Sequence, residues 1–100
     1  MQDAGQHQQL DELERKVQEA LACHGRGELD KAAVGEAYNN LAFAFLQLES
    51  LDHALANYDK AVAFAPGAFV AQGNRAAVLH KLGRLEEALE VQKQSIALSP

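Results

Sequence analysis

The chain repeats itself with a period of 34 residues, and this repeat restricts its fold more than any other feature. The stretch AVAFAP at residues 61–66 is echoed by SIALSP at residues 95–100, which makes Pro66 and Pro100 equivalent. The same shift pairs identical small and apolar residues: Ala37 with Ala71, Asn40 with Asn74, Ala42 with Ala76, Leu48 with Leu82, Leu51 with Leu85, Ala54 with Ala88, Leu55 with Leu89 and Ala63 with Ala97. A fixed period of this length predicts stacked units of one supersecondary motif.

Each repeated unit has the apolar spacing of two helices. Apolar residues recur three or four positions apart, first at Leu41, Phe45 and Leu48 and then at Leu51, Leu55, Tyr58 and Val62. The pattern breaks at residues 49–50 and again at 83–84. We therefore predict two helices of about 14 residues per unit, joined by a tight turn. Proline ends the second helix because its ring cannot continue the hydrogen-bond ladder.

The spacing and the residue types resemble the tetratricopeptide repeat, a 34-residue helix-turn-helix unit. In the first unit, residues 35–68, the matching residues are Tyr38, Asn40, Leu41, Ala42, Phe45, Leu51, Ala54, Tyr58, Ala61 and Pro66. In the second, residues 69–100, they are Asn74, Ala76, Leu79, Gly83, Leu85, Ala88, Ile96 and Pro100. Gln72, Arg75, Gln92 and Ser95 depart from the pattern there, and we expect them to thin the core. The resemblance implies an all-α fold, an α-α superhelix of helix-turn-helix hairpins.

The N-terminal third is predicted to cap these units. Residues 1–9 are expected to form a disordered polar tail, and residues 10–34 a capping helix followed by a degenerate partial repeat. The capping helix is predicted to run from about Gln8 to Cys23, because apolar residues from Leu10 to Leu21 follow one stripe. A continuous helix from about Glu28 to Leu48 is predicted next. Five helices are expected in all.

The charge and the cysteine content narrow the possible partners and the compartment. The net charge is −5, so the basic surface that binds nucleic acid is not expected. The longest nearly apolar run, residues 61–71, is interrupted by Pro66 and Gly67 and is too short to span a bilayer. The single cysteine, Cys23, excludes an internal disulfide and suits a reducing compartment. We therefore predict a cytoplasmic protein with neither a nucleic-acid partner nor a membrane segment.

Four histidines and one cysteine could suggest a metal site: His7, His24, His53, His80 and Cys23. None of them has the spacing that places two ligands on one side of a helix. The carboxylates at residues 11–14 and 86–87 are interpreted as solvated helix faces rather than catalytic pairs. Neither a nucleophile motif nor a phosphate-binding loop is present. The sequence therefore predicts no enzyme, no metal and no cofactor, with a small-molecule or metal sensor built on His80 as an alternative.

The resemblance also implies a binding site, because this family binds partners mainly in a concave groove lined by the first helix of each unit. Carried over by position, the groove consists of Asn39, Asn40, Phe43, Leu46 and Gln47 from the first unit and Asn74, Ala77, His80 and Lys81 from the second, with Glu36, Val70 and Gly73 beside them. Co-chaperones of the family hold a terminal carboxylate with paired cationic side chains beside asparagines. Here Asn40 and Asn74 are present without the cationic partners, so the asparagines are interpreted as structural side chains and chaperone tails are disfavoured ligands.

The expected function is a non-catalytic scaffold that binds a peptide or protein segment in this groove. Phe43 and Leu46 are interpreted as apolar anchors for the partner, with burial under the capping helix as the alternative. A second hypothesis is self-association as a homodimer through the C-terminal helix, which carries Leu85, Leu89, Ile96 and Leu98. A piece of a longer repeat array would explain the same apolar helix.

Overall fold

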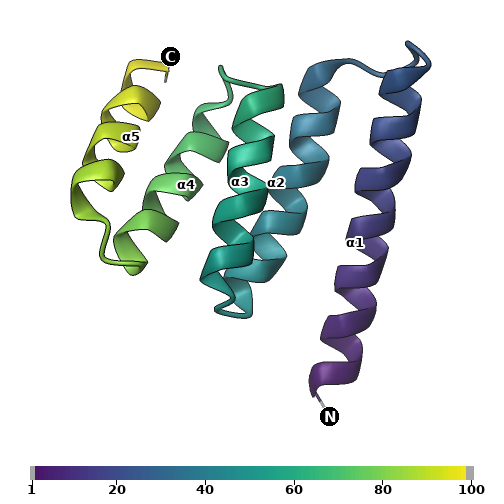
Figure 1. Ribbon diagram of the computed structural model, residues 1–100, viewed down its shortest axis with the longest axis horizontal. Coiled ribbons are helices and arrows are strands. Elements are labelled where there is room, and N and C mark those ends of the chain that lie inside the picture. The colour runs from purple at the N-terminus through teal and green to yellow at the C-terminus, as the bar shows by residue number, and fades with distance from the viewer. Residues whose placement is uncertain (1, 99–100) are drawn as a thin grey trace.

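Five helices make up residues 2–98, the part of the chain that the computed structural model describes. They are α1 (Gln2–Gly25), α2 (Lys31–Gln47), α3 (Leu51–Phe64), α4 (Phe69–Lys81) and α5 (Leu85–Leu98). The helices lie side by side in chain order, and each runs roughly antiparallel to the one before it (Figure 1). The predicted all-α fold of stacked helical hairpins is therefore confirmed, with α2–α3 as the first hairpin and α4–α5 as the second.

Three of the helices end in the same left-handed turn. Gly27, Glu49 and Gly83 follow α1, α2 and α4 with φ values of 77°, 59° and 79°. The amide of the next residue then bonds back to a carbonyl five residues earlier, as from Ser50 to Phe45 at 2.9 Å. Both turns of the repeat, predicted at residues 49–50 and 83–84, are confirmed, and they share one geometry although only one of them has glycine.

The N-terminal region differs from its prediction at two points. α1 begins at Gln2, so the expectation of a disordered tail is wrong for residues 2–9, where no proline interrupts the helix. α2 begins at Lys31 instead of Glu28, because the Asp30 side chain accepts a hydrogen bond from the Ala33 amide at 3.0 Å and caps the helix. The long predicted helix is therefore shorter by its first turn.

The core runs through the stack as three apolar clusters. Val17 and Ala20 of α1 pack on Val34, Tyr38 and Leu41 of α2, so α1 covers the α2 side of the first hairpin. Between the hairpins, Ala42, Ala54, Tyr58 and Val78 are completely buried. Inside the second hairpin, Ala76, Leu79, Ala88 and Val91 form the third cluster. Small residues on facing helices let the backbones approach closely enough for these contacts.

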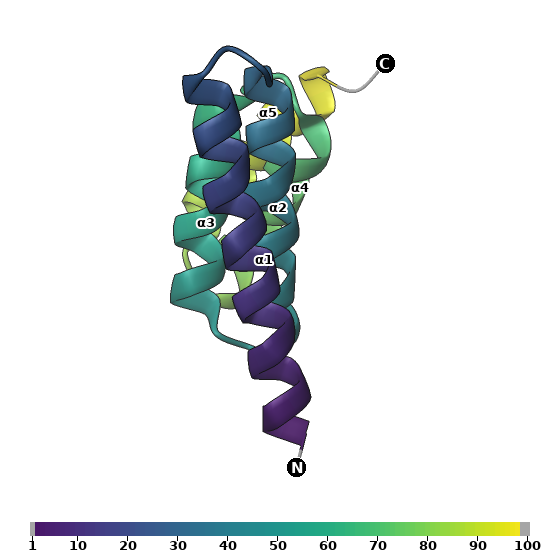
Figure 2. The same ribbon diagram turned by 90° about the vertical axis from the view of Figure 1, so that its right-hand side faces the viewer.

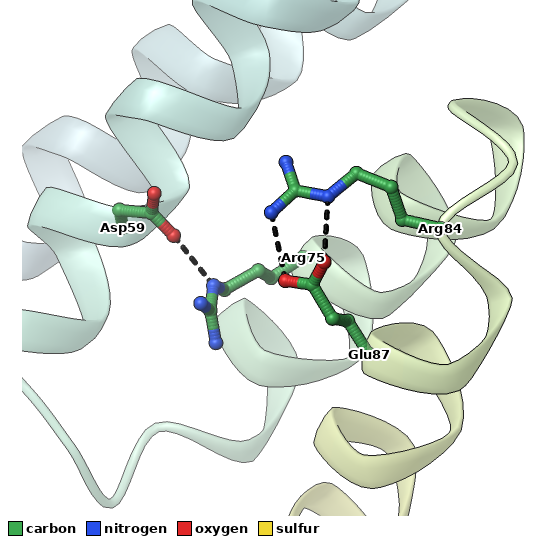
Figure 3. Close-up of polar contacts among 4 residues, drawn as sticks. All are labelled: Asp59, Arg75, Arg84 and Glu87. Atoms are coloured by element: carbon green, nitrogen blue, oxygen red, sulfur yellow. Dashed lines mark hydrogen bonds and ion pairs between the residues drawn. The ribbon is translucent and has the colours of Figure 1, made fainter.

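The departures of the second unit from the repeat pattern have structural roles of their own. Arg75, which replaces the leucine of the first unit, pairs with Asp59 of α3 and so joins the two hairpins, as Figure 3 shows. Ser95 donates a hydrogen bond from its hydroxyl to the Phe69 carbonyl at 2.9 Å and links α5 to α4. Gln72 is buried at the place that Tyr38 fills in the first unit. Two of the departures thus form polar contacts between helices, and Gln72 places a polar side chain in the core.

Candidate functional site

The first helices of the two hairpins present matching faces to solvent. On α2, Glu36, Asn40, Phe43 and Gln47 are all exposed and lie four, three and four residues apart, which places them on one face. Their equivalents on α4 are Val70, Asn74, Ala77 and Lys81, of which only Asn74 is half-buried. In the side view, α2 and α4 lie on the same side of α3 (Figure 2). These two faces form the candidate groove.

A small apolar hollow lies at the end of this groove where α2 and α4 begin. It measures about 260 Å³ and is lined by small residues, Ala32, Gly35, Ala61, Ala65, Ala68 and Ala71, together with Glu36, Asn39 and Val70. Gly35 is what brings α2 this close to α3, because a Cβ placed there would lie only 2.9 Å from the Cβ of Ala65. The hollow therefore depends on a close helix crossing.

Asn39 is one of the polar residues that line this hollow. Its residue is half-buried, its Oδ1 atom is buried, and no described residue donates a hydrogen bond to that oxygen. Glu36 and Val70 are exposed, so they reach solvent beside the hollow. This oxygen is therefore a buried acceptor that is unpaired among the described residues, which costs free energy.

The two predicted anchors, Phe43 and Leu46, have different environments. Phe43 is 47% exposed, so it lies open on the groove and is not covered by α1. Leu46 is half-buried and packs against the cluster that contains Val78, which makes it part of the contact between the hairpins. Phe43 is thus available to a partner, whereas most of Leu46 is already used by the fold.

Four of the six remaining predicted residues line two other depressions. Gln47 and Lys81 line a shallow one of about 480 Å³ at the opposite end of the groove, beside the turn that contains Glu49. Ala77, His80 and Lys81 line a hollow of about 490 Å³ between α4 and α5. Asn40 is exposed and Asn74 is half-buried. The nine predicted residues therefore do not form a single cavity.

The small residues that form the first hollow were missed by sequence reasoning, which followed large and polar side chains. Ala61, Ala65, Ala68 and Ala71 recur at spacings of three and four across the turn between the hairpins. Together with Gly35 in α2, this run of small residues was the available signal. It could not have shown a cavity by itself, because small residues also occur where helices pack without any space between them.

The titratable groups offer little chemistry. Burial raises the pKa of Tyr58 to about 12, and its hydroxyl has no partner among the described residues. The Arg84 guanidinium lowers the pKa of Glu87 through the bidentate contact drawn in Figure 3. His24 bonds to the Leu29 carbonyl, and His53 stacks on Phe45. These groups are placed as structural side chains.

Among the described residues, no three His, Cys, Asp or Glu side chains converge in a way that could hold a metal ion. Within residues 2–98, no helix combines the length and the apolar character that crossing a bilayer requires.

Comparison with known proteins agrees with the observed stack of hairpins. The model of the tetratricopeptide repeat family matches residues 35–67 and 70–100, which together make up more than half of the chain. These two matches coincide with the α2–α3 and α4–α5 hairpins. No curated protein matches the chain.

Proposed function

Since the chain belongs to the tetratricopeptide repeat family, whose repeats are generally protein-interaction modules, we propose that it is a non-catalytic scaffold for another protein. In this proposal a segment of the partner binds in the groove between α2 and α4. The groove needs only a shaped apolar surface and a few polar groups for this purpose. No reacting group is required of it.

The observation that carries the proposal is the apolar hollow beside Gly35. At about 260 Å³ it is smaller than the cavities that hold whole small-molecule ligands, and its size suits one large side chain. Its walls are mostly alanine, so an aliphatic or aromatic residue of the partner would displace water from a largely apolar surface. This hollow fixes the position of the segment in the groove.

Phe43 provides the second apolar contact of the groove. It lies two helical turns along α2 from Gly35 and is about half exposed. Aromatic side chains in such positions contribute much of the affinity in protein interfaces. A segment that places one apolar residue in the hollow and a second one against Phe43 would therefore use both.

The charges along the groove set a direction. Glu36 lies beside the hollow, whereas Lys81 lies at the opposite end, near the C-terminal ends of α2 and α4. A partner segment with a basic residue next to its first apolar anchor would complement Glu36, whereas its far end would lie near both Lys81 and Glu49. The class of ligand is thus an apolar segment with a basic residue beside the anchor that enters the hollow.

Selection of peptides from a random library on the purified protein would test this proposal. Calorimetric titration of a selected peptide would then be repeated with Ala32→Phe, which fills the hollow from an exposed position. We expect this substitution and Phe43→Ala each to weaken binding by roughly tenfold or more. Ala56→Phe, on the exposed surface of α3, is the matched control and should bind as the wild type does.

Two results would count against the groove. Selected peptides that bind Ala32→Phe and Phe43→Ala as tightly as they bind the wild type would place the binding site elsewhere. Selected peptides without an apolar residue beside a basic one would contradict the proposed ligand class. In that case Glu36→Lys would leave the affinity unchanged, whereas the proposal requires it to fall.

A further inference from the structure

Large apolar side chains on α5 form a stripe that faces solvent. Leu85, Leu89 and Ile96 are 56%, 55% and 68% exposed, and Gln92, which is also exposed, completes the stripe. Residues with these spacings share one face of a helix. The side chain of Leu98, which was predicted to join them, lies outside the described residues. Apolar side chains gathered in this way mark an interaction surface rather than scattered surface residues.

The first hairpin shows the same face in its covered state. The equivalents of Leu85, Leu89 and Gln92 are Leu51, Leu55 and Tyr58 of α3, and these pack in the cluster with Val78 of α4. At the corresponding place in the second hairpin there is a hollow of about 490 Å³, lined in part by Gly73, Ala77, His80, Gln92 and Ile96. The stripe and this hollow together form the face on which, one unit earlier, another helix packs.

We propose that this face binds a second copy of the chain, with the two α5 helices packed antiparallel about a twofold axis. The four stripe residues are spaced by four, three and four positions, so the pattern reads the same in both directions. An antiparallel pair centred between Leu89 and Gln92 places Leu85 opposite the partner's Ile96. It also places Leu89 opposite the partner's Gln92. These spacings are those of a coiled-coil seam, and a twofold interface requires a surface that complements itself.

The charges beside the stripe favour the antiparallel direction. On one flank, Ala88 is buried against α4 and Ser95 bonds to α4, so this flank faces the chain's own hairpin. The other flank carries Glu86 and Lys93, both exposed, and neither forms an ion pair within the described residues. In an antiparallel pair the outer flanks meet, and Glu86 lies beside the partner's Lys93.

Symmetry forms this ion pair twice. A parallel pair would instead turn the outer flank of each helix toward the flank that carries Ala88 and Ser95, so Glu86 and Lys93 would no longer face each other. The antiparallel arrangement is therefore the one that satisfies both the apolar stripe and its charged flank.

The same symmetry extends the interface beyond α5. A helix of 14 residues is about 21 Å long, so one helix pair buries less than the roughly 800 Å² per partner that is typical of stable complexes. Because α4 lies beside the stripe, the twofold axis also brings together the α4 walls of the two hollows, at Gly73 and Ala77. The result is a four-helix interface made from both α4–α5 hairpins. It takes Ala77 from the α4 face of the groove, but neither Phe43 nor the residues of the hollow beside Gly35 are part of it.

Sedimentation equilibrium at several protein concentrations would test the stoichiometry. We expect a reversible dimer of the 10.8 kDa chain. Leu89→Glu should weaken dimerisation roughly a hundredfold, because symmetry places two carboxylates in the interface. Leu89 is exposed in the single chain, so the helical circular dichroism of this variant should be unchanged. A wild type that stays monomeric at all concentrations, or a Leu89→Glu variant that dimerises as tightly, would overturn the proposal.

Charge reversal tests the direction of the helices. Glu86→Lys and Lys93→Glu each replace two attractions with two repulsions and should weaken dimerisation roughly tenfold. Mixed together, the two variants should form a heterodimer with the affinity of the wild type, because opposite charges meet again. Gln94→Lys, on the opposite side of α5, is the control and should change nothing. A mixture that associates no better than either variant alone would overturn the antiparallel arrangement.

Discussion

Replacing Glu49 with glycine should raise the free energy of unfolding by about 1 kcal/mol. Glu49 is held at a φ of 59°, where a residue with a Cβ loses roughly 1 to 2 kcal/mol. The turn cannot relax without losing the bond from the Ser50 amide to the Phe45 carbonyl, which measures 2.9 Å. Glycine removes the steric cost, although ordering it costs roughly 0.5 to 1 kcal/mol. Loss of the carboxylate at the end of α2 contributes a few tenths of a kcal/mol, because the helix dipole disfavours it there.

Urea unfolding followed by helical circular dichroism measures this free energy. In thermal unfolding, the same change should raise the melting temperature by roughly 4 to 8 °C. Glu49→Gln keeps the Cβ and removes the charge, so it should show only the few tenths of a kcal/mol that are due to the dipole.

Gly83→Glu is the reciprocal change at the second turn, where φ is 79°. A Cβ at Gly83 would meet no heavy atom within 4 Å, so the expected loss of about 1 kcal/mol would come from the backbone alone. The reasoning fails if Glu49→Gly destabilises the protein or if Gly83→Glu leaves its stability unchanged.

Four further substitutions test the packing in the same urea titrations. Gly35→Ala should lower the free energy of unfolding by roughly 1 to 2 kcal/mol, since its Cβ would lie 2.9 Å from that of Ala65, whereas Gly73→Ala, 3.5 Å from its nearest neighbour, should be neutral or stabilising. Tyr58→Phe should be neutral or stabilising near pH 7, because it removes a buried hydroxyl that has no partner among the described residues. Burial raises the pKa of Tyr58 to about 12, so the unfolded chain ionises first. The wild type should therefore lose about 2 kcal/mol more than Tyr58→Phe as the pH rises from 10 to 12. Identical pH profiles would contradict this. Phe43→Ala should cost about 1 kcal/mol, and a loss of ~3 kcal/mol or more would mean that this residue is core.

The sequence by itself determined the hairpins and their turns. The recurrence of Pro66 at Pro100 predicted the repeat, and the apolar spacing predicted both helices of each unit. The breaks at residues 49–50 and 83–84 predicted both turns, and the structure adds that Glu49 and Gly83 share a left-handed conformation, at φ values of 59° and 79°. These features depend on residues that are close in sequence, because helix periodicity and helix ends are set by neighbours within one or two turns.

The boundaries of the N-terminal helices were predicted less well. The prediction began the second helix at Glu28, whereas the hydrogen bond from the Ala33 amide to the Asp30 side chain makes Asp30 the cap and starts the helix at Lys31. Residues 2–9 had no apolar stripe and were expected to be disordered, yet they continue α1. Both errors concern how far a helix extends, which depends on a balance of small local free energies.

The candidate site was decided only by the tertiary structure. Phe43 and Leu46 are three residues apart and equally apolar, yet one is exposed on the groove and the other packs between the hairpins. Arg75 departs from the repeat pattern, and only the structure shows that it pairs with Asp59, sixteen residues away in the chain. The hollow beside Gly35 exists because residues from three helices meet around a space that none of them fills. Burial and cavities are sums over segments that are distant in the chain, so the periodicity of one segment cannot determine them.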